Sequence, residues 1–249
     1  MADFNFLIRL KALLVHLAGS IVLAALALGL IYGLWYPAPL ATAVGVSSIV
    51  LLMLAVDVVL GPMLTFAVYQ PGKKSLRFDL AVIVFIQLAA FAYGMATIAQ
   101  GRPAWLVFNE DRFDVAQASD LDTRYLADAL PEFRHPPWSG PAWVASVNPE
   151  DVEKRNQLVM ESALGGSDLP QRVDLYRPLV QEADNMLARA KPLSDLEQFN
   201  TLEAVADAAG KWPQADAWLP LMSRSQPMVV LIERKVASPV AIVDLRPWD

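Results

Sequence analysis

An acidic residue, Asp57, lies in the middle of the apolar run "LLMLAVDVVLGPMLTF". A charged residue near the centre of a bilayer costs at least about 2.5–3.5 kcal/mol, so it normally faces protein or a water-filled path. Intramembrane aspartyl hydrolysis would need two such acids on facing helices. Asp79 is the one other candidate, and it falls at the edge of an apolar stretch beside a basic loop. Catalysis by Asp57 is therefore a weak interpretation, and we expect no enzyme.

Other residue types that carry chemistry are few. The two histidines, His16 and His135, have no spaced partner that would complete a zinc site, and the chain has no cysteine. Acids at 110, 111 and 114 surround a predicted turn, but they lack the ordered oxygen spacing of calcium loops. There is no glycine-rich phosphate loop. The sequence predicts no metal and no cofactor.

The apolar residues form three long stretches near the N-terminus. Residues 12–36 and 80–99 contain no charged side chain, and residues 38–69 contain Asp57 alone. About 20 mainly apolar residues span the hydrocarbon core of a bilayer. We therefore predict an N-terminal three-helix transmembrane bundle over residues 1–100, with spans at about 12–36, 44–69 and 80–99. The first stretch is too long for a cleaved signal peptide and ends in interfacial aromatic residues.

Basic residues beside these spans predict their orientation. Arg9 and Lys11 precede the first span, and the loop between the second and third spans carries Lys73, Lys74 and Arg77. The loop between the first two spans carries none. By the positive-inside rule, the N-terminus and the basic loop lie in the cytoplasm. An odd number of spans then places the domain over residues 101–249 outside the cytoplasm.

Helical spacing suggests a role for Asp57. Asp57, Gly61 and Thr65 follow one another at four-residue intervals, so they share one helix face. Pro62 is expected to kink this helix. Counted by depth, Gln87 of the third span lies near this face, and the first span presents His16 among small residues. Two interpretations remain open: the polar side chains satisfy one another within the bundle, or Asp57 faces a groove that receives another protein's helix.

The remaining residues predict an α+β extracytoplasmic domain with a small antiparallel sheet over 101–249. The expected strands are a hairpin over residues 103–118, a strand at 142–147 and a terminal hairpin over 227–248. The expected helices are 148–166, 176–190 and 194–210. Negative charge, with 26 acidic against 20 basic residues in the whole chain, argues against nucleic acid as a partner. The loop "PEFRHPPWSGPAW" carries Trp138 and Trp143. These two side chains either form a contact surface for a partner or pack in the core.

Several motifs together resemble a known family. The run "VDVVLGPMLTFAVYQPGKKSLRFDLAVI", the later "RPAWLVFNEDRFDV", the exit "GLWYPAPL" and the ending "VDLRPW" are similar to the TfpX/TfpZ type IV pilin accessory proteins. The residues that match the recurrent motif are Asp57, Gly61, Pro62, Lys73, Lys74, Trp105 and Asp111.

The resemblance implies a multi-pass protein of the bacterial inner membrane, with its C-terminal domain in the periplasm. It implies a role as chaperone or assembly factor for the major type IV pilin, without catalysis. The implied partners are the pilin's transmembrane helix, its globular head and membrane lipid. A membrane-anchored periplasmic ligand-binding or sensor module is the alternative, and it would need a concave apolar pocket in the outer domain.

Overall fold

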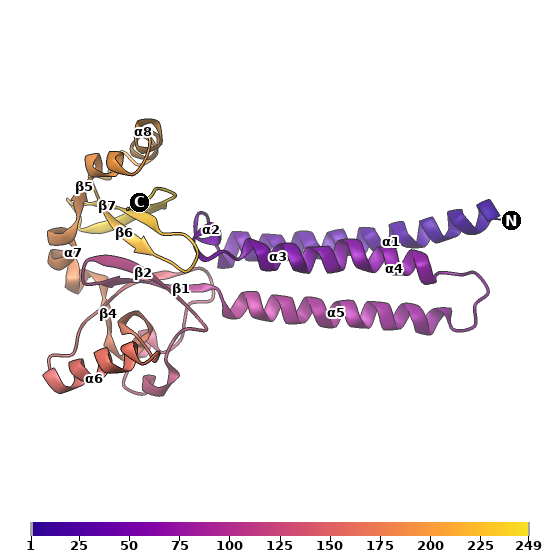
Figure 1. Cartoon of the computed structure of the whole chain (residues 1–249), viewed down its shortest axis with the longest axis horizontal. Helices are drawn as coiled ribbons and strands as arrows, with labels where there is room; N and C mark the ends of the chain where they lie inside the picture. The colour runs from indigo at the N-terminus through magenta and orange to yellow at the C-terminus, as the bar shows by residue number, and fades with distance from the viewer. Residues whose placement is uncertain (1, 249) are drawn as a thin grey trace. The chain divides into compact units, whose positions relative to one another are not determined.

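The computed structural model describes residues 2–248, with side chains from residue 5 onwards (Figure 1). The chain divides into two compact units. The helical unit comprises the residues up to Leu34 and Val46–Gln100. The sheet unit comprises Trp35–Gly45 and the residues from Gly101 onwards. The segment Trp35–Gly45 therefore differs from expectation: the sequence assigned it to the transmembrane domain, whereas it packs with the residues that follow the third apolar helix.

Three long helical stretches make up the helical unit. The first is α1 (Ala2–Leu30), continued by a π-helical turn, η1 (Ile31–Trp35). The second joins α3 (Ser47–Leu54), the π-helical turn η2 (Ala55–Leu60) and α4 (Gly61–Val68), and the third is α5 (Leu76–Gln100). The stretches Asn5–Trp35, Ser47–Val68 and Leu76–Gln100 are each long and apolar enough to cross a bilayer. Many of their large apolar side chains are exposed, as on a surface covered by hydrocarbon.

The segment Trp35–Gly45 contains a short helix, α2 (Leu40–Val44), that ends at Gly45 with φ +75°. Leu40 and Ala43 are buried in the core of the sheet unit. The carbonyl oxygen of Ala43 accepts hydrogen bonds from the Ser223 hydroxyl and from the main-chain N–H groups of Ser225 and Gln226. This segment is therefore an integral part of the sheet unit.

A mixed sheet organises the second unit. Its strands are β1 (Pro103–Asn109), β2 (Arg112–Gln117), β3 (Ala142–Ser146), β4 (Tyr176–Pro178), β5 (Lys191–Pro192), β6 (Ala217–Met222), β7 (Met228–Glu233) and β8 (Ser238–Val243). Their order is β4-β3-β1-β2-β6-β7-β8, with β5 paired to β6. β1 pairs with β3, and β2 with β6, in parallel. The expected small antiparallel sheet is therefore wrong in both size and direction, although the two predicted hairpins are confirmed.

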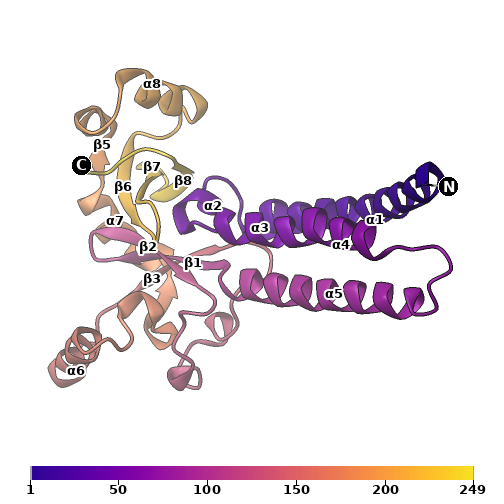
Figure 2. The same cartoon turned by 45° about the vertical axis from the view of Figure 1, so that its right-hand side comes forward.

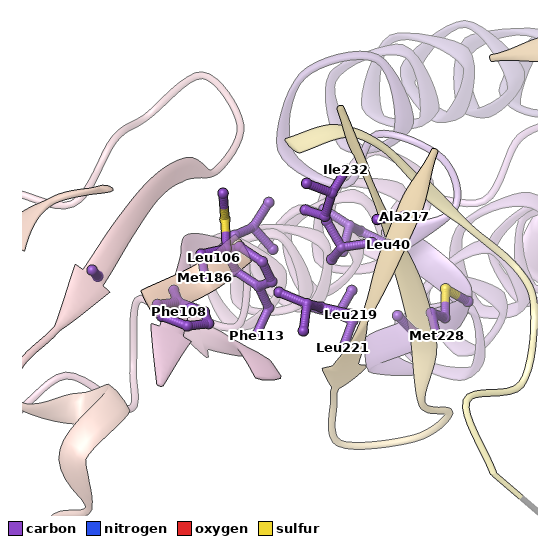
Figure 3. Close-up of a cluster of buried hydrophobic side chains, with 13 residues drawn as sticks. Leu40, Leu106, Phe108, Phe113, Met186, Ala217, Leu219, Leu221, Met228 and Ile232 are labelled. Carbon is purple, nitrogen blue, oxygen red and sulfur yellow. The ribbon is translucent and has the colours of Figure 1, made fainter. Parts of the chain in front are cut away.

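Alternation along the strands distributes the core over both faces of the sheet. In β1, Leu106 and Phe108 join the cluster that contains Leu40, whereas Trp105 and Val107 join a second cluster on the other face. In β6, Leu219 and Leu221 face the Leu40 cluster, whereas Trp218 faces a third cluster. Figure 3 shows Leu40 next to Ala217 and Ile232, and the side chains of β1 and β2 in the same cluster. Both faces of the central strands are thus covered.

The helices of the sheet unit are shorter than predicted. They are α6 (Val152–Ala163), α7 (Ala183–Arg189) and α8 (Leu202–Lys211), with 3₁₀ turns η3 (Thr123–Tyr125), η4 (Pro131–Phe133), η5 (Leu169–Gln171), η6 (Val173–Leu175), η7 (Leu179–Glu182) and η8 (Leu193–Gln198). Asp151 caps α6 through the main-chain N–H of Glu153 at 2.8 Å, so Asn148 is not the cap. Thr201 caps α8 in place of Ser194. The predicted helix 176–190 begins instead as β4, which pairs with β3 up to Pro178.

A charged cluster ties α6 to the loops around it. The Asp122 carboxylate accepts hydrogen bonds from the Arg124 guanidinium at 2.6 Å and 2.9 Å, and from the Ser167 hydroxyl. Arg124 also pairs with Glu161 of α6. The hydrogen bonds from Arg124 lower the pKa of Asp122 well below its usual range, and the bond from Ser167 adds to this shift. The charged Asp122 carboxylate therefore holds Arg124 and Ser167 together beside α6.

Candidate functional site: a groove between the three apolar helices

The middle helical stretch holds the other two together. α1 packs on η2 and α4, and α5 packs on α3, η2 and α4. Figures 1 and 2 show α1 and α5 running alongside this middle stretch within the helical unit. A groove lies along the middle stretch, with walls from α1 and α5. It has a volume of about 800 Å³ and is lined by Ile8, Lys11, Ala12, Val15, His16, Gly19, Ser20, Leu23, Asp57, Thr65, Tyr69, Leu80, Val84, Gln87 and Leu88.

A π-helical turn shapes the floor of this groove. Pro62 has no N–H to donate to the preceding turn, and its ring would crowd a regular helix. The helix therefore widens at Ala55–Leu60 before it continues from Gly61. Asp57 lies within this turn and is 5% exposed. π-Helical turns are rare and often occur at functional sites. The expected kink at Pro62 thus takes the form of a π-helical turn that contains the buried acid.

Two hydrogen bonds join the helices around the groove. His16 Nδ1 and Thr65 Oγ1 lie 2.6 Å apart and connect α1 to α4. Gln87 Nε2 donates to the main-chain oxygen of Asp57 at 3.3 Å and connects α5 to η2. The interpretation in which the side chains of Asp57, Gln87 and Thr65 satisfy one another is therefore wrong in detail, because Thr65 pairs with His16 and Gln87 donates to the main chain of Asp57.

Two acceptors in the groove lack donors. Gln87 Oε1 is buried without a partner. The Asp57 carboxyl group borders the groove and receives no hydrogen bond from the residues that the structure describes. Gln87 is 8% exposed. A buried polar atom without a hydrogen bond costs about 1–3 kcal/mol. Asp57 and Gln87 therefore form a polar level in the groove, which means a depth at which hydrogen-bond acceptors have no donor from this chain.

Gly61 creates the space that Gln87 occupies. A Cβ atom built on Gly61 would lie 1.8 Å from Gln87 Nε2. At Gly29, on α1, the same Cβ atom would meet nothing within 4 Å.

We expect Gly61→Ala to displace Gln87 and to lower the stability of the helical unit by about 1–3 kcal/mol through overpacking. Thermal unfolding of the full chain in detergent, followed by tryptophan fluorescence, measures this effect. Gly29→Ala is the matched control and is expected to unfold at or slightly above the wild-type temperature, because alanine favours a helix. Equal unfolding temperatures for the two variants would contradict the close approach of Gln87 to Gly61.

Of the residues singled out by sequence, the groove is lined by His16, Asp57, Thr65 and Gln87. Gly61 and Pro62 are buried in the same middle stretch but do not line the groove. Ser20, expected on the same face of the first span as His16, also lines the groove, together with Lys11 and Tyr69, which were not expected there. Tyr69 follows Thr65 by four residues, and this spacing was the available signal for it. The basic residues Lys73, Lys74 and Arg77 lie where α4 connects to α5, and Lys73 pairs with Asp79 at 2.7 Å.

The two tryptophans belong to the sheet unit and have different environments. Trp143 packs edge-on against Phe113 at 5.1 Å and contributes to the core. Trp138 is 58% exposed, although its ring lies 5.2 Å from that of Trp35 and 4.7 Å from the Arg102 guanidinium. Of the two, Trp138 alone is available to a partner.

The sheet unit has a hollow of its own, of about 730 Å³, where β1 and β3 end beside α7. It is lined by Phe108, Glu110, Ser146, Val147, Asn148, Glu182, Asn185, Ala188 and Arg189. Its lining is mostly polar and charged, in contrast to the apolar pocket that a small-molecule sensor would need. No group of three metal-ligating side chains occurs among the residues that the structure describes.

Comparison with known proteins identifies the family. The fimbrial assembly protein of serogroup I of Dichelobacter nodosus is 33% identical over 247 residues, which covers 96% of both chains. This chain belongs to the fimbrial assembly protein family. The serogroup E1 protein of that organism is also 33% identical, over 249 residues and 96% of both chains. The fimbrial assembly protein of serogroups C1 and C2 is 38% identical over 130 residues, or 51% of this chain and 96% of the relative.

The sequence model described as "Fimbrial assembly protein FimB" matches residues 4–45. In this fimbrial assembly protein, those residues include the α1 wall of the groove and the segment Trp35–Gly45 that packs into the sheet unit. No solved structure matches the chain.

Proposed function

We propose that this protein is a membrane-anchored accessory factor of type IV pilus assembly that binds and stabilises the major pilin. The observation that carries the proposal is the 33% identity to a fimbrial assembly protein across 96% of both chains. The narrower resemblance to the TfpX/TfpZ pilin accessory proteins supports the major pilin as the partner. Three apolar helices support an anchor in the inner membrane.

The groove supports a direct role in holding the pilin. A subunit that waits in the membrane before assembly must keep its apolar helix in hydrocarbon or against protein. The groove in the helical unit offers such a helix two walls and a floor. The sheet unit, with the exposed Trp138, is the proposed contact for the pilin's globular head.

Charge supports the orientation. Lys73 and Lys74 lie between α4 and α5, Arg77 lies in the first turn of α5, and Arg9 and Lys11 lie in the first three turns of α1. By the positive-inside rule, this distribution of charge supports the proposal that these ends lie in the cytoplasm and the sheet unit in the periplasm.

The groove also favours binding over catalysis. Asp57 is the one acid among the described residues that line it. Aspartyl hydrolysis uses two carboxyl groups that share a proton, and a second one is not at hand here. We therefore propose a non-catalytic role for Asp57.

The test is capture of the pilin. Tagged full-length protein is purified from the membranes of its host in mild detergent, and the retained proteins are identified. We expect the major pilin to be retained, and a similarly tagged, unrelated three-span protein to retain none. Absence of the pilin from the wild-type preparation, together with normal piliation after deletion of the gene, would overturn the proposal.

A further inference from the structure

The unsatisfied acceptors of the groove lie at one level of the helical unit. Gln87 Nε2 bonds to the Asp57 main chain, so Gln87 on the α5 wall and Asp57 on the floor lie at the same depth in the groove that both residues line. Both residues are more than nine-tenths buried. The molecule that occupies the groove at this level therefore determines whether the two acceptors find a hydrogen-bond donor.

The depth of this level follows from the His16–Thr65 bond. α1 and the middle stretch are consecutive and run in opposite directions, and the bond sets Thr65 level with His16. Asp57 precedes Thr65 by eight residues, so it lies about 12 Å further along the groove at 1.5 Å per residue. Lys11 lies about 7 Å from His16 in the other direction. The polar level is thus about 20 Å from the basic end of the groove, deep within the apolar stretch.

A lipid does not suit this arrangement. An anionic headgroup would pair with Lys11, but its hydrocarbon chain would then lie against Asp57 and Gln87 and leave both acceptors unsatisfied. Hydrocarbon offers no donor, and an unpaired polar group within it costs several kcal/mol. The apolar lining alone would suit a lipid chain. The two acceptors are therefore the feature that favours a protein helix with a donor over a lipid.

The α1 wall suits a helix. Ala12, Gly19 and Ser20 line the groove on one face of α1, and small residues let two helices approach closely within a membrane. The lining of α1 runs from Ile8 to Leu23, which is about 22 Å of helix. A Cβ atom on Gly19 would meet nothing within 4 Å, so the space in front of it is open.

We propose that the groove binds one transmembrane helix of a partner protein, and that this helix presents a hydrogen-bond-donating side chain or amino group to Asp57 and Gln87. The inference rests on the proposed function for the identity of the partner, the pilin. It adds the recognition rule: a helix of the right depth that lacks the donor binds weakly, because it buries both acceptors without a partner.

The test combines a probe in the groove with variants that fill it or remove an acceptor. A photo-crosslinking amino acid replaces Val84, which lines the groove, or the exposed Phe85, which does not. The full-length protein is irradiated in host membranes, and adducts are mapped by mass spectrometry. We expect the Val84 probe to label a transmembrane helix of the pilin, and the Phe85 probe to label lipid.

Matched variants test the two parts of the rule. Gly19→Leu extends a side chain into the groove from a position where a Cβ atom meets nothing within 4 Å, and Gly29→Leu places the same side chain on α1 outside the groove lining. Asp57→Leu removes the acceptor, whereas Asp57→Asn keeps an acceptor oxygen. We expect Gly19→Leu and Asp57→Leu to reduce the adduct about tenfold or more, and the other two to retain it. Asp57→Leu removes a buried polar group, so its level in the membrane should not fall.

The outcomes separate the inference from the proposed function. If the pilin is retained by the wild type but the Val84 probe labels lipid alone, or if Gly19→Leu retains the adduct, the inference is overturned and the proposed function stands. If the pilin is not retained but the probe labels another protein's helix at a donor residue, and Asp57→Leu abolishes the adduct, the inference stands and the proposed function falls.

Discussion

A soluble protein that begins at Gly101 is expected to lose most of the stability of the sheet unit. It would lack the segment Trp35–Gly45, in which Leu40 is 2% exposed and Trp35 is 3% exposed. Burial of each large apolar side chain contributes about 1.5–3 kcal/mol. Loss of several such side chains approaches the whole stability of a domain, about 5–15 kcal/mol. Urea unfolding followed by tryptophan fluorescence would measure the loss, and aggregation on expression would be its extreme form.

Restoring the segment supplies the control. Residues 35–45, joined by a flexible glycine-serine linker to the chain from Gly101 onwards, should fold cooperatively and unfold at clearly higher urea. Leu40→Asp in this fusion would place a charge in the core beside Ala217 and Ile232, and it should return the midpoint to that of the shorter protein. The same midpoint with and without the segment would show that the sheet unit does not depend on it.

The second large effect concerns Asp122 and depends on pH. Asp122→Asn removes the charge that the Arg124 guanidinium and the Ser167 hydroxyl bind. Hydrogen bonds to a charged group contribute about 1.5–3 kcal/mol, so we expect a loss of about that size at pH 7 in denaturation of the full chain. Asp128 is an exposed acid whose side chain has no hydrogen-bond or ion-pair partner among the described residues, so Asp128→Ala should have little effect.

The direction of the pH dependence follows from the lowered pKa of Asp122, whose largest cause is the hydrogen bond from Arg124. A carboxyl group with a lowered pKa in the folded state stabilises the fold above its ordinary pKa, near 4. This contribution is lost as pH falls through the lower folded-state value. The difference between wild type and Asp122→Asn should therefore be complete at pH 7 and shrink progressively below about pH 4. A difference that grows in acid would contradict the assignment.

The helical unit could largely be predicted, because length and apolarity together leave few alternatives. The ends of the helices could not. Lys11 and Asp79 were placed outside the spans, yet both lie within helices, α1 and α5. An apolar stretch marks the part of a helix that suits hydrocarbon, whereas the helix itself continues for as long as its backbone hydrogen bonds are favourable.

The site could be predicted in part. Four-residue spacing placed Asp57, Gly61 and Thr65 on one face, and depth placed Gln87 near them. The π-helical turn at Ala55–Leu60 and the bond from Thr65 to His16 were not predicted. Spacing within one helix fixes which residues share a face, but the partner of each side chain depends on how neighbouring helices are rotated and shifted.

The sheet was the least predictable part. β6 was missed, because "AWLPLM" is a continuous apolar run with a proline inside it. On one edge of β6, β5 pairs with Ala217 and Trp218, and β2 pairs with Leu221 and Met222. Neither strand pairs with Pro220, so the missing N–H of this proline is tolerated on that edge. The parallel pairing of β2 with β6 joins residues about a hundred positions apart in the sequence, and no local pattern specifies such a partner.

The hydrogen bond from Ser223 to the carbonyl oxygen of Ala43 joins residues that are 180 positions apart. During synthesis, Ala43 leaves the ribosome long before Ser223, Ser225 and Gln226 exist. Chain growth proceeds at about 5–20 residues per second, so the segment waits on the order of ten seconds or more for its partners. Over that interval Leu40 has no β6 or β7 to cover it. Closure of this unit is therefore one of the last events in its biogenesis, and a ribosome that stalls shortly before Ser223 leaves an apolar segment open to chaperones and proteases.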